Sequence, residues 1–131
     1  MAANTSPIFP LTPKIGSAVL ATANTARTAT GVTNLDAMIT AGAAGTRVDL
    51  IKVVAAGTVT AGVVRIWYFS GTGNAVLLKE ILIAATTPST TVETFTVEWA
   101  PSNLVLPASS VLLASTHNSE GFNVLCFAGD Y

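Results

Sequence analysis

The stretch VVRIWYFSGTGNAVLLKEILI, residues 63–83, decides the fold class of this chain. Apolar and β-branched residues fill both of its halves, and the polar segment SGTGN at residues 70–74 separates them. Glycine and asparagine tolerate the positive φ angles that a tight turn between two antiparallel strands requires. The stretch therefore predicts a β-hairpin.

Glycine-rich turns also bind phosphates, so SGTGN has a second interpretation. A dinucleotide fingerprint has a third glycine, a P-loop has a Lys-Ser/Thr pair, and both present the amides of a following helix to the phosphate. Here the glycines are followed by AVLLKEILI, which has the period of a strand. The pattern favours a turn and predicts no bound cofactor.

The chain after residue 45 continues this pattern of short strands and turns. Segments rich in Val, Ile, Thr and aromatic residues alternate with turn signals such as PSN, LPASS and HNSEG. We expect strands at 46–56, 60–70, 74–85, 90–100, 110–116 and 121–128, with earlier ones at 16–22 and 27–33. The one window for a helix is 34–40. This spacing predicts an all-β chain, built as an antiparallel sandwich or barrel.

The N-terminal segment differs in composition from the rest of the chain. Prolines at positions 7, 10 and 13 fix φ and favour an extended backbone. The apolar residues of the segment are Ile8, Phe9, Leu11 and Ile15. We therefore expect an extended arm at residues 1–15 and a single β domain at residues 16–131. The arm either lies on a neighbouring subunit or partner, or folds onto its own domain or stays mobile.

Both faces of the hairpin strands are apolar. Along 63–69, Trp67 and Phe69 lie on the face opposite Ile66, and along 76–83 Leu77, Ile81 and Ile83 share a face with Lys79. An antiparallel sheet in a soluble monomer usually has one solvated face, so we expect the arm or another subunit to cover the second one. The candidate interface residues are Ile8, Phe9, Leu11, Ile15, Trp67, Phe69, Leu77, Ile81 and Ile83.

The composition is poor in charge. Only 10% of the residues are charged, against roughly 25% in an average soluble domain, and the net charge is −1. The six Lys and Arg residues are scattered, which argues against nucleic acid or an anionic membrane as a partner. No secretory signal and no apolar run of ~20 residues is visible, so we expect synthesis in a cytoplasm and no membrane span.

Residues typical of catalysis are sparse. His117 is the only histidine, no nucleophile motif or metal-ligand cluster appears, and we expect no enzymatic activity and no metal. Trp67, Tyr68 and Trp99 have a second interpretation as a sugar-stacking surface, but no group of amides and acids accompanies them. The single cysteine, Cys126, lies in an apolar segment and is expected to be a buried structural thiol.

Two segments carry a resemblance to a known class of proteins. They are GTRVDLIKVVAAGTVTAGVVRIWYFSGTGNAVLLKEILI at 45–83 and LVLPASSVLLASTHNSEGFNVLCFAGDY at 104–131. The most specific parts are the TAGVVRIW strand before a Gly/Asn hairpin, and LVLPA followed by a terminal FNV strand. This pattern resembles small virion structural proteins of tailed bacteriophages and prophages, the capsid decoration or cement proteins. The N-terminal segment has no counterpart in it.

The resemblance implies both a fold and a role. Decoration proteins are β-sandwich or jelly-roll domains that bind the outer surface of the expanded capsid, often as trimers, and stabilise it. It implies the major capsid protein and further copies of this chain as partners, and a location on the virion after synthesis in a bacterial host. Two alternatives remain: another virion component, such as a tail, connector or fibre-base subunit, and a carbohydrate-binding module or small enzyme.

Overall fold

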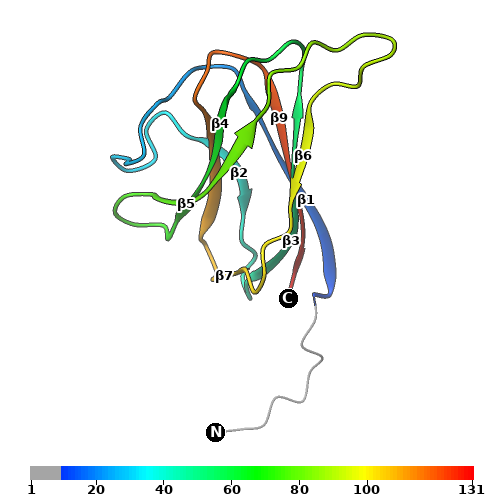
Figure 1. Ribbon diagram of the computed structural model, residues 1–131. Helices are drawn as coiled ribbons and strands as arrows, with labels where there is room; N and C mark the ends of the chain where they lie inside the picture. Colours follow the sequence, from blue (N-terminus) through cyan, green and yellow to red (C-terminus); the bar gives the residue numbers. More distant parts are fainter. Residues whose placement is uncertain (1–9) are drawn as a thin grey trace, which may run out of the picture.

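The computed structural model describes residues 10–131, and these residues form nine β-strands and no helix (Figure 1). The strands are β1 (Thr12–Leu20), β2 (Asp36–Thr40), β3 (Thr46–Ala55), β4 (Gly62–Phe69), β5 (Val76–Ile83), β6 (Thr96–Trp99), β7 (Val105–Leu106), β8 (Val111–Thr116) and β9 (Phe122–Asp130). The prediction of an all-β chain is confirmed.

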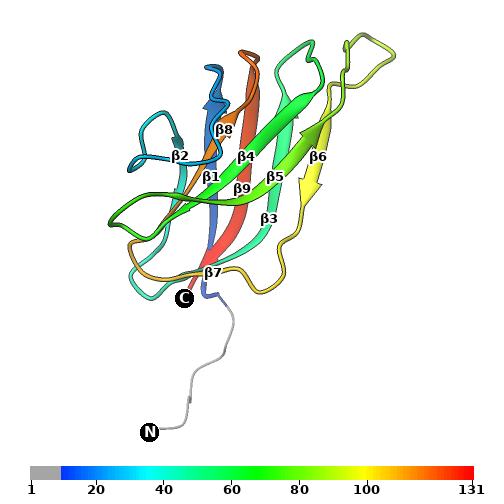
Figure 2. The same ribbon diagram turned by 60° about the vertical axis from the view of Figure 1, so that its left-hand side comes forward.

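The strands form two antiparallel sheets that pack face to face as a β-sandwich (Figures 1 and 2). Sheet A has the order β1-β9-β3-β6, with the short β7 also paired to β3. Sheet B has the order β2-β8-β4-β5. Both sheets therefore join strands that lie far apart in the sequence.

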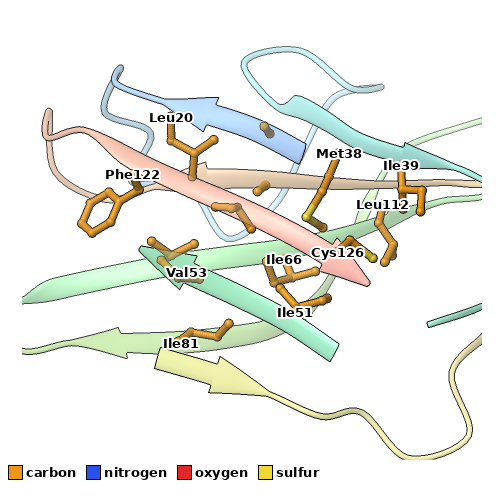
Figure 3. Packing of buried hydrophobic residues seen from close by; sticks show 14 of the residues in the cluster. Leu20, Met38, Ile39, Ile51, Val53, Ile66, Ile81, Leu112, Phe122 and Cys126 are labelled. Atoms are coloured by element: carbon orange, nitrogen blue, oxygen red, sulfur yellow. The ribbon is translucent and has the colours of Figure 1, made fainter. Parts of the chain in front are cut away.

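The core lies between the two sheets and follows the period of two along each strand. Ile51 and Val53 of β3 and Cys126 of β9 point inward from sheet A, while Ile66 and Leu112 point inward from sheet B (Figure 3). All five are fully buried. Alternate residues of a strand point to opposite faces, so each strand contributes every second side chain to this layer.

Most of the predicted strands are found, but two predictions were wrong. Residues 27–33 form a loop, in which Gly31 has a φ of 61° and the amide of Thr33 donates to the carbonyl of Thr30. The window 34–40 contains strand β2, which pairs with β8 and has an irregularity between Ala37 and Ile39. Because of this irregularity both Met38 and Ile39 are buried, so the segment lacks the simple alternation of a strand.

The boundary predicted between the arm and the domain was also wrong. Strand β1 begins at Thr12 and pairs with β9 in unbroken register from Thr12–Asp130 to Leu20–Phe122. Residues 12–15 are therefore part of sheet A, where Ile15 lies opposite Phe127. Residues 1–9 of the predicted arm, including Ile8 and Phe9, lie outside the described residues.

The segment SGTGN is the turn of the β4–β5 hairpin. Gly71 has a φ of 104° and Gly73 a φ of 77°, values that side chains disfavour. Strand β5 continues directly beyond the turn, as the sequence predicts.

A β-bulge changes which face Leu77 occupies. Ile66 pairs with Lys79, but Trp67 pairs with Leu77, so Leu78 is the additional residue. One extra residue reverses the direction of the side chains before it. Leu77 therefore packs beside Trp67 on the outer face of sheet B, and the prediction that it shares a face with Ile81 was wrong.

The sandwich is closed on the side where β1 and β2 meet. A Cβ built on Gly16 of β1 would lie 2.7 Å from the Cβ of Ile39 in β2, which is closer than real side chains approach. Glycine at this position lets the two sheets come together. On the opposite side of the sandwich a groove separates β5 from β6.

Candidate functional site

A groove of about 380 Å³ separates the edge strands β5 and β6 on the open side of the sandwich. Its lining residues are Lys79, Glu80, Ile81, Leu82, Val97, Glu98 and Trp99. The Nζ of Lys79 lies 5.8 Å from the centroid of the Trp99 ring, within the range of a cation–π interaction. This contact links the two sheets across the groove.

Strand β5 forms one wall of this groove and is the edge of sheet B. Within residues 10–131 it pairs only with β4, so its other side presents backbone N–H and C=O groups that have no ladder partner. Its apolar side chains Val76, Leu78 and Leu82 are exposed, Leu82 to 76%. Edge strands of this kind pair readily with an added strand from another chain.

Residues 79–83, the half of β5 after the bulge, are better suited to pairing with a strand from another chain. The bulge at Leu78 twists the N-terminal half, whereas Lys79–Ile66 to Ile83–Gly62 pair with β4 without a break. Leu82 lies within this half and is the most exposed large apolar side chain in residues 10–131. We therefore take Leu82 and the adjoining groove as the candidate binding surface.

The predicted interface residues are in three different environments. Leu11 and Ile15 are exposed to 72% and 65% on the side of sheet A, and Phe69 and Leu77 are half-buried. Trp67, Ile81 and Ile83 are buried within the chain itself. The prediction that these last three form an interface was wrong.

Residues 21–35 of the same chain cover the part of the outer face of sheet B that surrounds Trp67. Ala29 and Leu35 of this segment pack against a small second core formed by Trp67, Ala75 and Leu113. The indole N–H of Trp67 donates to Ser115 Oγ at 2.9 Å, which satisfies its only polar group. Around Trp67 the second face is thus covered by a segment of the chain itself, whereas Leu82 on the same face is exposed.

Hydrogen bonds hold the covering segment at both ends. The amide of Asn24 donates to the carbonyl of Thr116 at 2.8 Å, beside the end of β8. The amide of Ala75 donates to the carbonyl of Gly31, and the amide of Gly31 donates to Asn74 Oδ1, both at 2.8 Å. These bonds attach the segment to the β4–β5 turn.

A fully buried arginine, Arg65, lies beneath this segment. Its Nε donates to Glu80 Oε2 at 2.9 Å, its Nη1 donates to the carbonyl of Asn24 at 3.1 Å, and its Nη2 lies 3.2 Å from His117 Nδ1. A buried charge needs such partners because it has lost its hydration. All these partners belong to the fold, so Arg65 anchors the segment and is closed to a ligand.

Glu80 connects this network to the covering segment, because it contacts both Arg65 and the more exposed Arg27. Arg27 Nε lies 3.1 Å from Glu80 Oε2, so two guanidinium groups share one carboxylate. The hydrogen bond from Arg27, followed by that from Arg65, lowers the pKa of Glu80 below its ordinary value against the opposing effect of burial. Sequence reasoning missed this network; its only signal was an arginine inside an otherwise apolar strand.

A second polar cluster fixes the end of β9 in the sandwich. Asp130 accepts a short hydrogen bond from Thr46 Oγ1, and Lys14 Nζ lies 3.3 Å from Asp130 Oδ2. The hydrogen bond from Thr46, and then that from Lys14, lowers the pKa of Asp130. This cluster connects β1, β3 and β9.

The two side chains considered for reactivity, His117 and Cys126, lie in different surroundings. Residues 10–131 contain no set of three or more His, Cys, Asp and Glu side chains placed to hold a metal ion. His117 contacts Arg65, and Ser115 accepts from Trp67. Burial, followed by the charge of Asp49, raises the pKa of the Cys126 thiol to about 12, and the predicted burial of Cys126 is confirmed.

Two of the three aromatic residues considered for a sugar-stacking surface pack inside the protein. Trp67 is fully buried and Tyr68 packs against the main core, which leaves Trp99 beside Lys79 in the groove. Carbohydrate recognition of this type uses exposed aromatic faces.

Comparison of the chain with models of protein families, with curated proteins and with solved structures gives no match. Residues 10–131 also contain no helix long and apolar enough to cross a membrane.

Proposed function

We propose that this chain is a non-enzymatic virion structural protein of a tailed phage or prophage, which binds the outer surface of an assembled capsid and stabilises it. The partners in this proposal are the major capsid protein and further copies of the chain, with a trimer favoured by the resemblance of residues 45–83 and 104–131. The protein is made in the bacterial cytoplasm and acts on the virion.

The observation that carries the proposal is the exposed apolar edge strand β5 beside an open groove. Leu82 is 76% exposed although its neighbours Ile81 and Ile83 are buried in the core. A charge-poor chain that leaves such a strand open to solvent is suited to permanent assembly, because obligate interfaces are more apolar than transient ones.

Stabilisation by such a protein follows from mass action. A subunit that binds the assembled lattice and not its dissociated parts shifts the equilibrium toward the shell. Burial of one leucine side chain contributes about 1.5–3 kcal/mol, and the many identical sites of a capsid multiply the effect.

The order of the strands supports a jelly roll as the form of the sandwich. Apart from the short β7, the eight remaining strands are divided equally between the sheets, as β1-β9-β3-β6 and β2-β8-β4-β5. Jelly rolls consist of eight strands in two sheets and occur in viral capsid domains. Because one fold hosts many unrelated functions, binding to the capsid is the decisive measurement.

The test is co-sedimentation of the full chain with expanded shells of the major capsid protein encoded in the same genome. We expect the protein to sediment with the shells and to raise their melting temperature. Leu82→Ser should weaken binding about tenfold to a hundredfold, which corresponds to the loss of about 1.5–3 kcal/mol of apolar burial.

Val105→Ser is the matched control, because Val105 is 49% exposed and lies in β7, away from the groove. It should bind as the unmodified chain does. If the unmodified chain stays in the supernatant, the proposed function is wrong. If it binds and Leu82→Ser binds equally well, the surface is wrong and the function stands.

A further inference from the structure

The outer face of sheet A carries an apolar row that crosses three strands. Ile15 of β1 lies opposite Phe127 of β9, and Phe127 lies opposite Leu50 of β3. All three side chains point away from the core, since their neighbours Cys126 and Ile51 point into it. The row is thus a continuous strip on the surface.

Residues 10–131 leave this strip partly open to solvent. Ile15 is 65% exposed, whereas Phe127 and Leu50 are half-buried. Sheet B has the covering segment 21–35 on its outer face, as described above. Sheet A has no equivalent cover within the described residues.

The described chain begins on this same face. Pro10 lies over Gly129, because a Cβ built on Gly129 would lie 3.0 Å from the Cγ of Pro10, and Gly129 faces outward like Phe127. The amide of Leu11 donates to the carbonyl of Asp130 at 2.8 Å, which fixes the entry into β1. Pro10, the first described residue, therefore lies on the outer face of sheet A.

A hollow of about 320 Å³ adjoins this point. Its lining residues are Pro10, Leu11, Pro13, Arg47, Asp49, Ala128 and Gly129. Gly129 and Phe127 are two residues apart on β9, so the apolar row begins about 7 Å from Gly129, over which Pro10 lies. Phe9 is bonded to Pro10 and is within reach of both the hollow and the row.

We propose that residues 1–9 dock in their own chain onto the outer face of sheet A, with Phe9 and Ile8 covering the hollow and the row Ile15–Phe127–Leu50. Residues 1–9 contain no charged side chain, so the contact buries no unpaired side-chain charge. Attachment at Pro10 gives the segment a high effective concentration at this face compared with a segment from another copy.

The experiment is disulfide trapping in the full chain. Phe9→Cys is combined with Leu50→Cys on the proposed face, and in the control with Leu82→Cys on the edge strand of sheet B. Cys126 is fully buried and does not compete for oxidation. Both proteins are oxidised at low concentration, and the products are separated on a non-reducing gel and identified by mass.

We expect an intramolecular disulfide that forms at least about tenfold faster in the Phe9/Leu50 pair than in the Phe9/Leu82 pair. Mainly intermolecular disulfides in the Phe9/Leu50 protein would show that the segment docks on another copy. Equal rates in the two pairs would show that it does not dock. Either result overturns the proposal.

A second variant avoids the introduced cysteines. Phe9→Ser should increase the binding of an apolar dye to the protein, because the row Ile15–Phe127–Leu50 becomes exposed. Val92→Ser, at an exposed loop position, is the control and should leave dye binding unchanged. An unchanged signal in Phe9→Ser would also overturn the proposal. Loss of capsid binding is not part of either readout, so this inference and the proposed function fail separately.

Discussion

Single residues set the geometry of this sandwich at two places where a side chain does not fit. Gly16 allows β1 and β2 to approach, since any Cβ there would collide with Ile39. Gly71 allows the β4–β5 turn, since its φ is 104°. The first position is required by packing and the second by backbone conformation.

Replacement of Gly71 by alanine should lower the free energy of unfolding by about 1–3 kcal/mol, because a side chain is strained at positive φ. Its built Cβ meets nothing closer than 3.6 Å, so backbone strain is the main cause. Urea unfolding followed by fluorescence measures the change. Gly57→Ala is the control: it has open space around its Cβ and an ordinary φ, and should be neutral or slightly stabilising. Equal stabilities would contradict the strain argument.

The sequence predicted Gly71 and Gly73 but not Gly16. A turn glycine lies between two strand patterns and is visible as a break in them. The requirement at Gly16 arises from β2, which is twenty or more positions away in the sequence and whose pairing no local pattern reveals. The same limit applies to Arg65, whose partners Asn24, Glu80 and His117 come from three separate segments.

At the scale of elements, the sequence prediction was wrong mainly for the covering segment 21–35, where it placed a strand at 27–33. The apolar second face of β4 was recognised, and so was the need for a cover. Its threonine- and alanine-rich composition suggested a strand at 27–33, whereas Ala29 and Leu35 pack onto Trp67 from a loop. Packing against a partner face decided the conformation, and local β-propensity did not.

Removal of the Trp67 side chain tests how much this cover contributes. Trp67→Ala should lower the free energy of unfolding by about 3–5 kcal/mol, as expected for a fully buried aromatic residue. It should also make the segment 21–35 open locally, so that trypsin cleaves after Arg27 well before it digests the rest of the chain.

Trp99→Ala is the matched control for this experiment. Trp99 is half-buried at the groove, so Trp99→Ala should lower the free energy of unfolding by less than Trp67→Ala does. It should also leave the peptide bond after Arg27 protected from trypsin. Equal cleavage in the two variants would mean that the segment is held by its hydrogen bonds to Thr116 and Ala75 and not by the packing on Trp67.

At the scale of the whole molecule, few charges hold distant parts of the chain together. Glu80 connects the covering segment to sheet B through Arg27 and Arg65. Asp130 connects β9 to β1 and β3 through Lys14 and Thr46. In a chain with only seven acidic residues, we expect these two carboxylates to contribute to the pH dependence of folding.

The sign of this dependence follows from the pKa of both groups, which is lowered in the folded state. Each carboxylate therefore contributes stability that is fully present above its unfolded pKa of about 4, and that is lost as pH falls through the folded value. We expect the melting temperature to be nearly constant from pH 7 to pH 5 and to fall steadily below about pH 4. In the double variant Glu80→Gln/Asp130→Asn the protein should be less stable at pH 7, and its melting temperature should change less between pH 5 and pH 2. Melting curves of both proteins over this range measure the difference, and parallel curves would show that other carboxylates control the response to acid.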